Sequence, residues 1–210
     1  MLEAEHGRIV IDGVDVSKLG LHALQTNISV IPQVPKLFSG CSVREKLDLF
    51  GLHSDESIQK VLRDCHLMQM IEGLADGLGS SVSESGSNFS VGQRQLLCLA
   101  RALLSKNKIL VLDEATASVD RRTDQLLQEA LQETFQDGTI VAIAHRLDTI
   151  IEFDFLLVLS AGKVVEFGSP ADLLRAEGAF ASMVGDTGKA MSSELKHLAY
   201  QNEAEARKEK

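Results

Sequence analysis

The chain has 210 residues, with 21 Lys and Arg against 30 Asp and Glu, which gives a formal net charge of -9 at pH 7. With 44% hydrophobic and 24% charged residues, the composition is that of a globular protein long enough for one domain with a substantial core. The acidic balance argues against a sequence-independent nucleic-acid binder, and no apolar run approaches the roughly 20 residues of a membrane-spanning helix.

In the first half of the chain, short apolar runs precede a long helical region. Residues 8–11 and 28–31 are rich in β-branched side chains and predict two strands. The sequence Ser42-Val43-Arg44-Glu45 fits a capping box, so a helix is expected to begin there. We expect a largely helical insertion over about residues 43–104, whose last helix begins after Ser90.

The central part of the chain predicts a parallel βαβ unit. Residues 109–112 and 140–144 are apolar at every position, a pattern typical of parallel strands buried on both faces. Residues 122–135 carry apolar side chains at helical spacing between these two strands. A strand, a helix and a strand in this order predict a right-handed crossover.

The last third of the chain predicts a hairpin followed by helices. Residues 155–159 form an apolar run and are joined across Ala161-Gly162 to residues 163–167, which predicts two antiparallel strands. Ser169-Pro170 has the pattern of a helix start. The apolar content drops after residue 188, and we expect residues 189–210 to form a charged C-terminal tail that frays at its end.

Two adjacent carboxylates end the predicted strand at 109–112. Asp113 and Glu114 would lie at the carboxyl edge of a parallel sheet, where α/β proteins bind their ligands. One carboxylate in such a place can hold hydrated Mg²⁺ while the other orients or deprotonates an attacking water. The alternative interpretation is a strand that simply ends in polar residues.

Three further polar features follow strands or begin helices. Residues 88–95 cross from a loop into a helix whose free N–H groups suit a phosphate, with Ser90 as the cap. A well-capped helix with solvated side chains is the alternative there. Gln33 follows the strand at 28–31, and His145 follows the strand at 140–144, where it would share the sheet edge with Glu114. Each of these two residues alone is also compatible with a structural role.

Taken together, these motifs resemble the nucleotide-binding domain of ABC transporters over about residues 7–185. The resemblance identifies Gln33 with the Q-loop, Glu114 with the catalytic glutamate after the Walker B strand, and His145 with the switch histidine. The remaining matches are the signature motif, at Phe89, Ser90, Val91, Gly92 and Gln93, and the D-loop, at Ala117, Ser118, Val119 and Asp120. Val91 and the following Gln95-Leu96-Leu97-Cys98 run are similar to the C-terminal nucleotide-binding domain of the ABCC, multidrug-resistance-associated type.

The resemblance implies an α/β, P-loop NTPase-like ABC ATPase domain with a helical subdomain, in which residues 1–188 form the partial domain. It implies ATP and Mg²⁺ as cofactors, with Glu114, His145 and Gln33 catalytic and the metal held by Asp113 and Gln33. The signature residues would contact an ATP held by a facing domain, and Asp120 would face that domain. The signature residues meant are Ser90, Val91, Gly92 and Gln93. The implied partners are transmembrane domains and an opposing nucleotide-binding domain, and no nucleic acid is implied. The implied location is the cytoplasmic face of a membrane, into which this chain itself would not insert.

One element of the family pattern is absent from the sequence. No GxxxxGK[ST] phosphate-binding loop occurs in the 210 residues, so the Walker A strand and loop are lacking. We therefore expect a fragment of a longer transporter that has no ATPase activity by itself, with an exposed flank on the strands at 109–112 and 140–144. The alternative is a truncated, non-catalytic module that docks on a full transporter and contributes only its signature helix.

Overall fold

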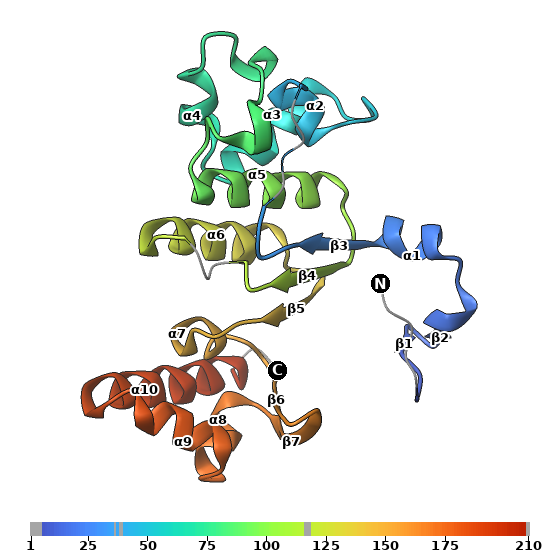
Figure 1. Cartoon of the computed structure of the whole chain (residues 1–210). Coiled ribbons are helices and arrows are strands. Elements are labelled where there is room, and N and C mark those ends of the chain that lie inside the picture. Colours follow the sequence, from blue (N-terminus) through green and yellow to red (C-terminus); the bar gives the residue numbers. More distant parts are fainter. Residues whose placement is uncertain (1–5, 36, 38–39, 116–118, 209–210) are drawn as a thin grey trace. The chain divides into compact units, whose positions relative to one another are not determined.

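The computed structural model describes residues 6–35, 37, 40–115 and 119–208. The chain divides into two compact units, residues 1–143 and residues 144–210. Figure 1 shows the elements of both. The mixed α/β architecture confirms the predicted fold class.

The first unit is built on a three-stranded parallel sheet in the order β3-β4-β5. Its strands are β3 (Ile28–Ile31), β4 (Ile109–Asp113) and β5 (Thr139–Ile143). Helix α6 (Arg121–Thr134) connects β4 to its parallel neighbour β5, which confirms the predicted βαβ unit. Strands β3 and β4 are parallel neighbours, so the polar residues at their carboxyl ends lie along the same edge of the sheet.

A small hairpin and a helix lead into this sheet. Strands β1 (Val10–Ile11) and β2 (Val14–Asp15) pair antiparallel, and the 3-10 turn η1 (Val16–Lys18) follows them. Helix α1 (Leu21–Asn27) then runs directly into β3. The strand predicted at residues 8–11 is therefore present, but it is only two residues long.

The helical insertion lies between β3 and β4 in the chain. It contains α2 (Val43–Leu47), α3 (Asp55–Asp64), α4 (Met68–Glu72), the 3-10 turns η2 (Gly77–Gly79) and η3 (Glu84–Gly86), and α5 (Val91–Leu104). A bridge between Ser42 and Ser81 ties its first residues to the loop before η3. Figure 1 shows α5 between the insertion helices and the sheet, and α5 contacts α2, α3, α6 and β3.

The core of the first unit lies on one face of the sheet. Leu110 and Leu112 of β4 are 0% and 4% exposed and pack with α5 and α6, whereas Val141 and Ile143 of β5 are 51% and 53% exposed. The prediction that β5 is buried on both faces is therefore wrong. Side chains alternate along a strand, so the core covers only every second residue of this apolar run, and these residues, Ile140 and Ala142, are partly buried.

The second unit combines a hairpin with helices, of which α8 and α9 contact β7 and α10 contacts α8 and α9. It begins with α7 (Leu147–Ile150), followed by the antiparallel strands β6 (Leu156–Ser160) and β7 (Lys163–Gly168), as predicted. Helices α8 (Pro170–Arg175), α9 (Ala179–Asp186) and α10 (Lys189–Ala206) complete it. Its core includes Phe180, Val184 and Leu195.

Helix α10 occupies most of residues 189–210, the segment predicted to be a charged C-terminal tail. Leu195 and Ala199 are 1% and 2% exposed because they pack into the core of this unit. Near the end of α10, the carboxylate of Glu203 pairs with the guanidinium groups of Arg175 and Arg207. Sparse but correctly spaced apolar residues are thus sufficient to order the helix as far as Ala206.

Candidate functional site at the sheet edge

Gln33 and Glu114 meet at the carboxyl end of the sheet. Gln33 lies just after β3, Glu114 follows β4 directly, and the Gln33 Nε2 atom donates a hydrogen bond to Oε2 of Glu114 at 2.6 Å. The sequence predicted both residues at this edge, and the structure brings their side chains into direct contact. An amide bonded to a carboxylate is a charge-assisted pair, stronger than a neutral hydrogen bond.

The backbone of Glu114 adopts a conformation that is uncommon for a non-glycine residue. Its φ is 47°, in the left-handed region, and its N–H donates to the carbonyl of Ile143 at 2.9 Å. The pairing of β4 with β5 thus continues to the residue that carries the side chain at the edge. Non-glycine residues held in this region concentrate at functional sites.

Asp113 supplies a second carboxylate at the same edge. It is the exposed last residue of β4, directly before Glu114. Carboxylate and amide oxygens are the ligand types that Mg²⁺ prefers, so the donor chemistry of Asp113 and Gln33 fits this ion. Within the described ranges no three His, Cys, Asp or Glu side chains gather as a ready-made metal site.

His145 belongs to the second compact unit. It is exposed and stands two residues after the end of β5. Its predicted role as a partner of Glu114 stays a prediction.

The signature residues begin helix α5. Ser90 Oγ accepts the N–H of Gln93 at 3.1 Å, and Gln93 Oε1 accepts the N–H of Ser90 at 2.8 Å, which is a complete capping box. Val91 is the first helical residue and Gly92 is buried. The local sequence dictates this start, because both partners of the box lie three residues apart.

Gly92 brings the start of α5 close to the start of α6. A Cβ atom at Gly92 would lie 2.6 Å from Cγ2 of Thr123 and 2.8 Å from its Oγ1. Thr123 Oγ1 in turn donates to Oδ2 of Asp120 at 2.7 Å, and Asp120 caps α6 through the N–H groups of Arg122 and Thr123. The Thr123 hydroxyl, followed by its backbone N–H, holds the pKa of Asp120 below its ordinary value. Of the predicted D-loop, Ala117 and Ser118 lie outside the described residues.

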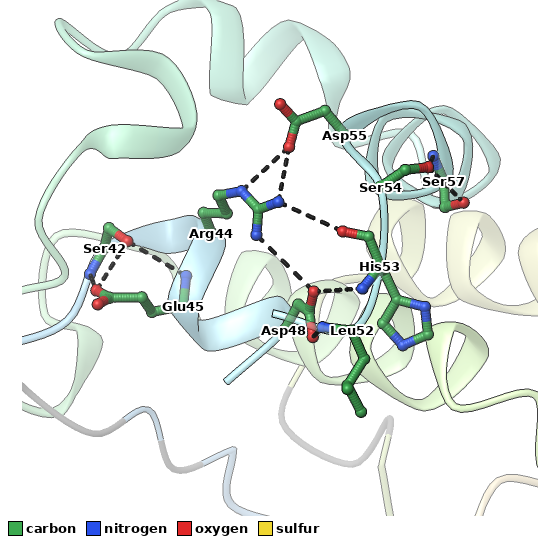
Figure 2. A network of polar contacts seen from close by, with 9 residues as sticks. All are labelled: Ser42, Arg44, Glu45, Asp48, Leu52, His53, Ser54, Asp55 and Ser57. Carbon is green, nitrogen blue, oxygen red and sulfur yellow. Dashed lines mark hydrogen bonds and ion pairs between the residues drawn. The ribbon is translucent and has the colours of Figure 1, made fainter. Parts of the chain in front are cut away.

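A buried carboxylate shapes the loop between α2 and α3. Asp48, 6% exposed, accepts the backbone N–H groups of Leu52 and His53 at 2.9 and 2.8 Å. Arg44 reaches Asp48 at 3.8 Å and Asp55 at 2.8 Å, so the loop is closed at both ends (Figure 2). Burial raises the pKa of Asp48, but the backbone N–H groups of His53 and Leu52, together with the charges of His53 and Arg44, outweigh it and leave the pKa below its ordinary value.

This loop carries an apolar tip. Leu49, Phe50 and Leu52 are 68%, 80% and 76% exposed. They border a cavity of about 640 Å³ that also touches Arg101 and Leu104 near the end of α5. Three large apolar side chains are thus exposed together on a loop that Asp48 and Arg44 hold by hydrogen bonds and ion pairs. Exposed apolar clusters are typical of interaction surfaces.

The comparisons with known proteins decide the family. A family model described as "ABC transporter" matches residues 1–117, which include β3, the helical insertion, β4 and Glu114. The chain belongs to the ABC transporter family. Within that family it is 52% identical over 188 residues to the human "ATP-binding cassette sub-family C member 2" and 53% identical over 188 residues to "Multidrug resistance protein mrp-7" of Caenorhabditis elegans.

The ABC transporter fold is also shown by a solved structure. A "bacterial Atm1-family ABC exporter with ATP bound" superposes with a TM-score of 0.81 at 31% identity, covering 88% of this chain and 32% of that one. The match to the human relative covers 90% of this chain but only 12% of the relative's length. Across the described part of the chain, no helix combines the length and apolarity needed to cross a bilayer.

Sequence reasoning missed three residues of this ABC domain that connect its motifs. Gln95 is 1% exposed, Arg94 donates to the carbonyls of Gly86 and Phe89 at 3.1 and 2.9 Å, and Thr123 bridges Gly92 to Asp120. The signal for Gln95 was available, because it lies four residues before Leu99 on the buried stripe of α5. Nothing in the spacing pointed to Arg94 or Thr123, whose partners lie in other segments.

Proposed function

We propose that this chain is the ATP-hydrolysing part of an ABCC-type exporter that supplies the reaction with its base and its signature helix. The observation that carries the proposal is the 2.6 Å hydrogen bond between Gln33 and Glu114 at the carboxyl edge of β3 and β4. A carboxylate in this position accepts a proton from an attacking water, and the Gln33 amide holds it in place.

The proposal assigns Mg²⁺ and ATP to the same edge. Asp113 would hold the ion with Gln33, and the bound ion would neutralise charge on the phosphate oxygens. His145, after β5, is proposed to contribute to the same reaction. The start of a helix favours phosphate, so the residues that begin α5 would contact an ATP bound to a facing domain. These residues are Ser90, Val91, Gly92 and Gln93.

The apolar tip at Leu49, Phe50 and Leu52 is proposed to contact the transmembrane domains. The support is its exposure and its fixation by Asp48 and Arg44. In an exporter assembled with this segment, Phe50→Ser should reduce transport without lowering the stability of the segment. Equal transport in the wild-type and Phe50→Ser proteins would contradict this contact.

The chain alone is proposed to be inactive. No GxxxxGK[ST] occurs in its 210 residues. Such a loop supplies several charge-assisted hydrogen bonds of about 1.5 kcal/mol each, so lacking four of them costs about 6 kcal/mol, or on the order of 10⁴ in affinity. Steady ATP turnover by the pure chain, abolished by Glu114→Gln, would overturn this part of the proposal.

The enzymatic role is tested in a chimera. The chain is fused behind the part of the human relative that precedes the matched region, and phosphate release is measured with and without Glu114→Gln. We expect turnover in the chimera and at least a hundredfold loss in the variant, which is the scale of a general base. A folded chimera that lacks turnover, or that keeps it in Glu114→Gln, would instead favour the non-catalytic docking module.

A further inference from the structure

Gln95 of helix α5 reaches the segment that follows β3. Its side-chain Nε2 donates to the carbonyl oxygens of Pro32 and Gln33, at 3.1 Å each, across more than 60 residues of sequence. The residue is 1% exposed, so neither bond competes with solvent. These contacts join the helix that begins with the signature residues to the backbone that carries Gln33.

The environment fixes which end of the Gln95 amide faces this segment. Both neighbours are carbonyl oxygens, which only accept, so the amide nitrogen has to point toward them. The other end, Oε1, is buried and finds no partner among the described residues. A buried polar atom without a partner lowers stability, so the side chain satisfies one end at the expense of the other.

The two accepting carbonyls flank a single Cα atom. The Pro32 carbonyl belongs to the peptide plane before Gln33, and the Gln33 carbonyl belongs to the plane after it. Because φ and ψ of a residue are the rotations of these two planes, Gln95 restrains both dihedrals of Gln33. Gln33 is otherwise exposed and outside any regular element, and Pro32 has no N–H with which to continue a ladder.

The restraint on the Gln33 backbone also affects the contact between Gln33 and Glu114. The direction of the Gln33 side chain follows from its backbone, and its Nε2 contacts Oε2 of Glu114 at 2.6 Å. We infer that Gln95 is a positioning residue that fixes the Gln33–Glu114 pair to helix α5, so that a shift of α5 moves the amide relative to the carboxylate. The inference rests on the proposed function only for the role of Glu114 as a base; the positional link itself requires no nucleotide.

The link is tested by NMR on the 210-residue chain without nucleotide. The side-chain amide resonance of Gln33 is assigned by its absence from Gln33→Leu, and Glu114→Ala marks its position when the bond to the carboxylate is lost. In Gln95→Met, which keeps the length of the side chain but has no donor, the resonance should move to the Glu114→Ala position. Exchange of the Gln33 side-chain protons should speed up about tenfold, as expected for the loss of a hydrogen bond to a charged group.

The matched control is Leu99→Ala, a core substitution one turn further along α5 at a residue that is 0% exposed. It should lower stability but leave the Gln33 resonance at the wild-type position, whereas an unchanged resonance in Gln95→Met would overturn the inference. If Gln95→Met lacks a cooperative unfolding transition, the resonance is read in Gln95→Asn, whose shorter side chain cannot reach both carbonyls. An unchanged resonance there also counts against the link.

The NMR test of the positioning role and the activity test of the hydrolytic role can fail independently of each other. An active chimera with an unchanged Gln33 resonance in Gln95→Met would refute the positioning role alone. A shifted resonance together with an inactive chimera would refute the hydrolytic role alone. In an active chimera, Gln95→Met should lower kcat more than it changes KM, because the pair that it positions acts on the reaction and not on ATP binding.

Discussion

The close approach of α5 and α6 at Gly92 makes a quantitative prediction for Gly92→Ala. The new methyl group would meet Thr123 Cγ2 at 2.6 Å and Oγ1 at 2.8 Å, distances that real Cβ atoms do not sustain. Overpacking of this kind costs about 1–3 kcal/mol, while replacing a helical glycine by alanine returns about 0.5–1 kcal/mol. We expect Gly92→Ala to lower the free energy of unfolding by about 1 kcal/mol, and by no more than about 2.5 kcal/mol.

The assay is urea unfolding at 25 °C, followed by circular dichroism, with the m-value checked for constancy. Gly185→Ala is the matched control, since no atom lies within 4 Å of the added Cβ in helix α9, and it should stabilise by about 0.5 kcal/mol. In a Thr123→Ala background, the cost of Gly92→Ala should fall by about 1 kcal/mol, because both of the nearest atoms are gone. Stabilisation by Gly92→Ala, or a cost that is independent of residue 123, would refute the reasoning.

Three further predictions concern buried groups. In Asp48→Asn an amide NH₂ group replaces one accepting oxygen and faces a part-buried backbone N–H, so thermal melts should show a loss of about 1–3 kcal/mol in the free energy of unfolding. The control Asp55→Asn, at a side chain that is 68% exposed, should cost less than about 1 kcal/mol. The pKa of Asp48 is lower in the folded protein than in the unfolded chain. The ionised Asp48 side chain therefore stabilises the folded state above about pH 4, and this contribution is lost as the pH falls. The unfolding free energy of Asp48→Asn should therefore decline less steeply than that of the wild type between about pH 5 and pH 3, and parallel slopes would argue against this origin. Burial raises the pKa of Cys65 to about 12, so iodoacetamide at pH 8 should label the half-buried Cys41 well before Cys65; equal labelling rates by mass spectrometry would exclude this protection.

Local chemistry explains what could be predicted from the sequence. The caps at Ser42 and Ser90 need only a partner three residues away, and the structure has both boxes complete. The neighbouring strands that carry Gln33 and Glu114 were predictable from apolar runs that end in polar residues, and the contact of these two side chains follows from the parallel order.

What could not be predicted depends on contacts between distant segments. The capping pattern gives no sign that Gly92 packs against Thr123, or that Gln95 turns toward the carbonyl of Pro32. Exposure of β5 likewise depends on which face the helices cover, and an all-apolar run contains no alternation that would distinguish the faces. The helix at 189–206 was missed because its few buried residues are diluted by charged ones.

The outer edge of β5 has a practical consequence. Within the described residues the sheet order ends at β5, and Val141 and Ile143 of this strand are about half exposed. An open strand edge beside apolar side chains is the arrangement through which separate molecules pair. Unfolding of this protein therefore has to be followed at several protein concentrations, because a transition that moves with concentration reports self-association as well as folding.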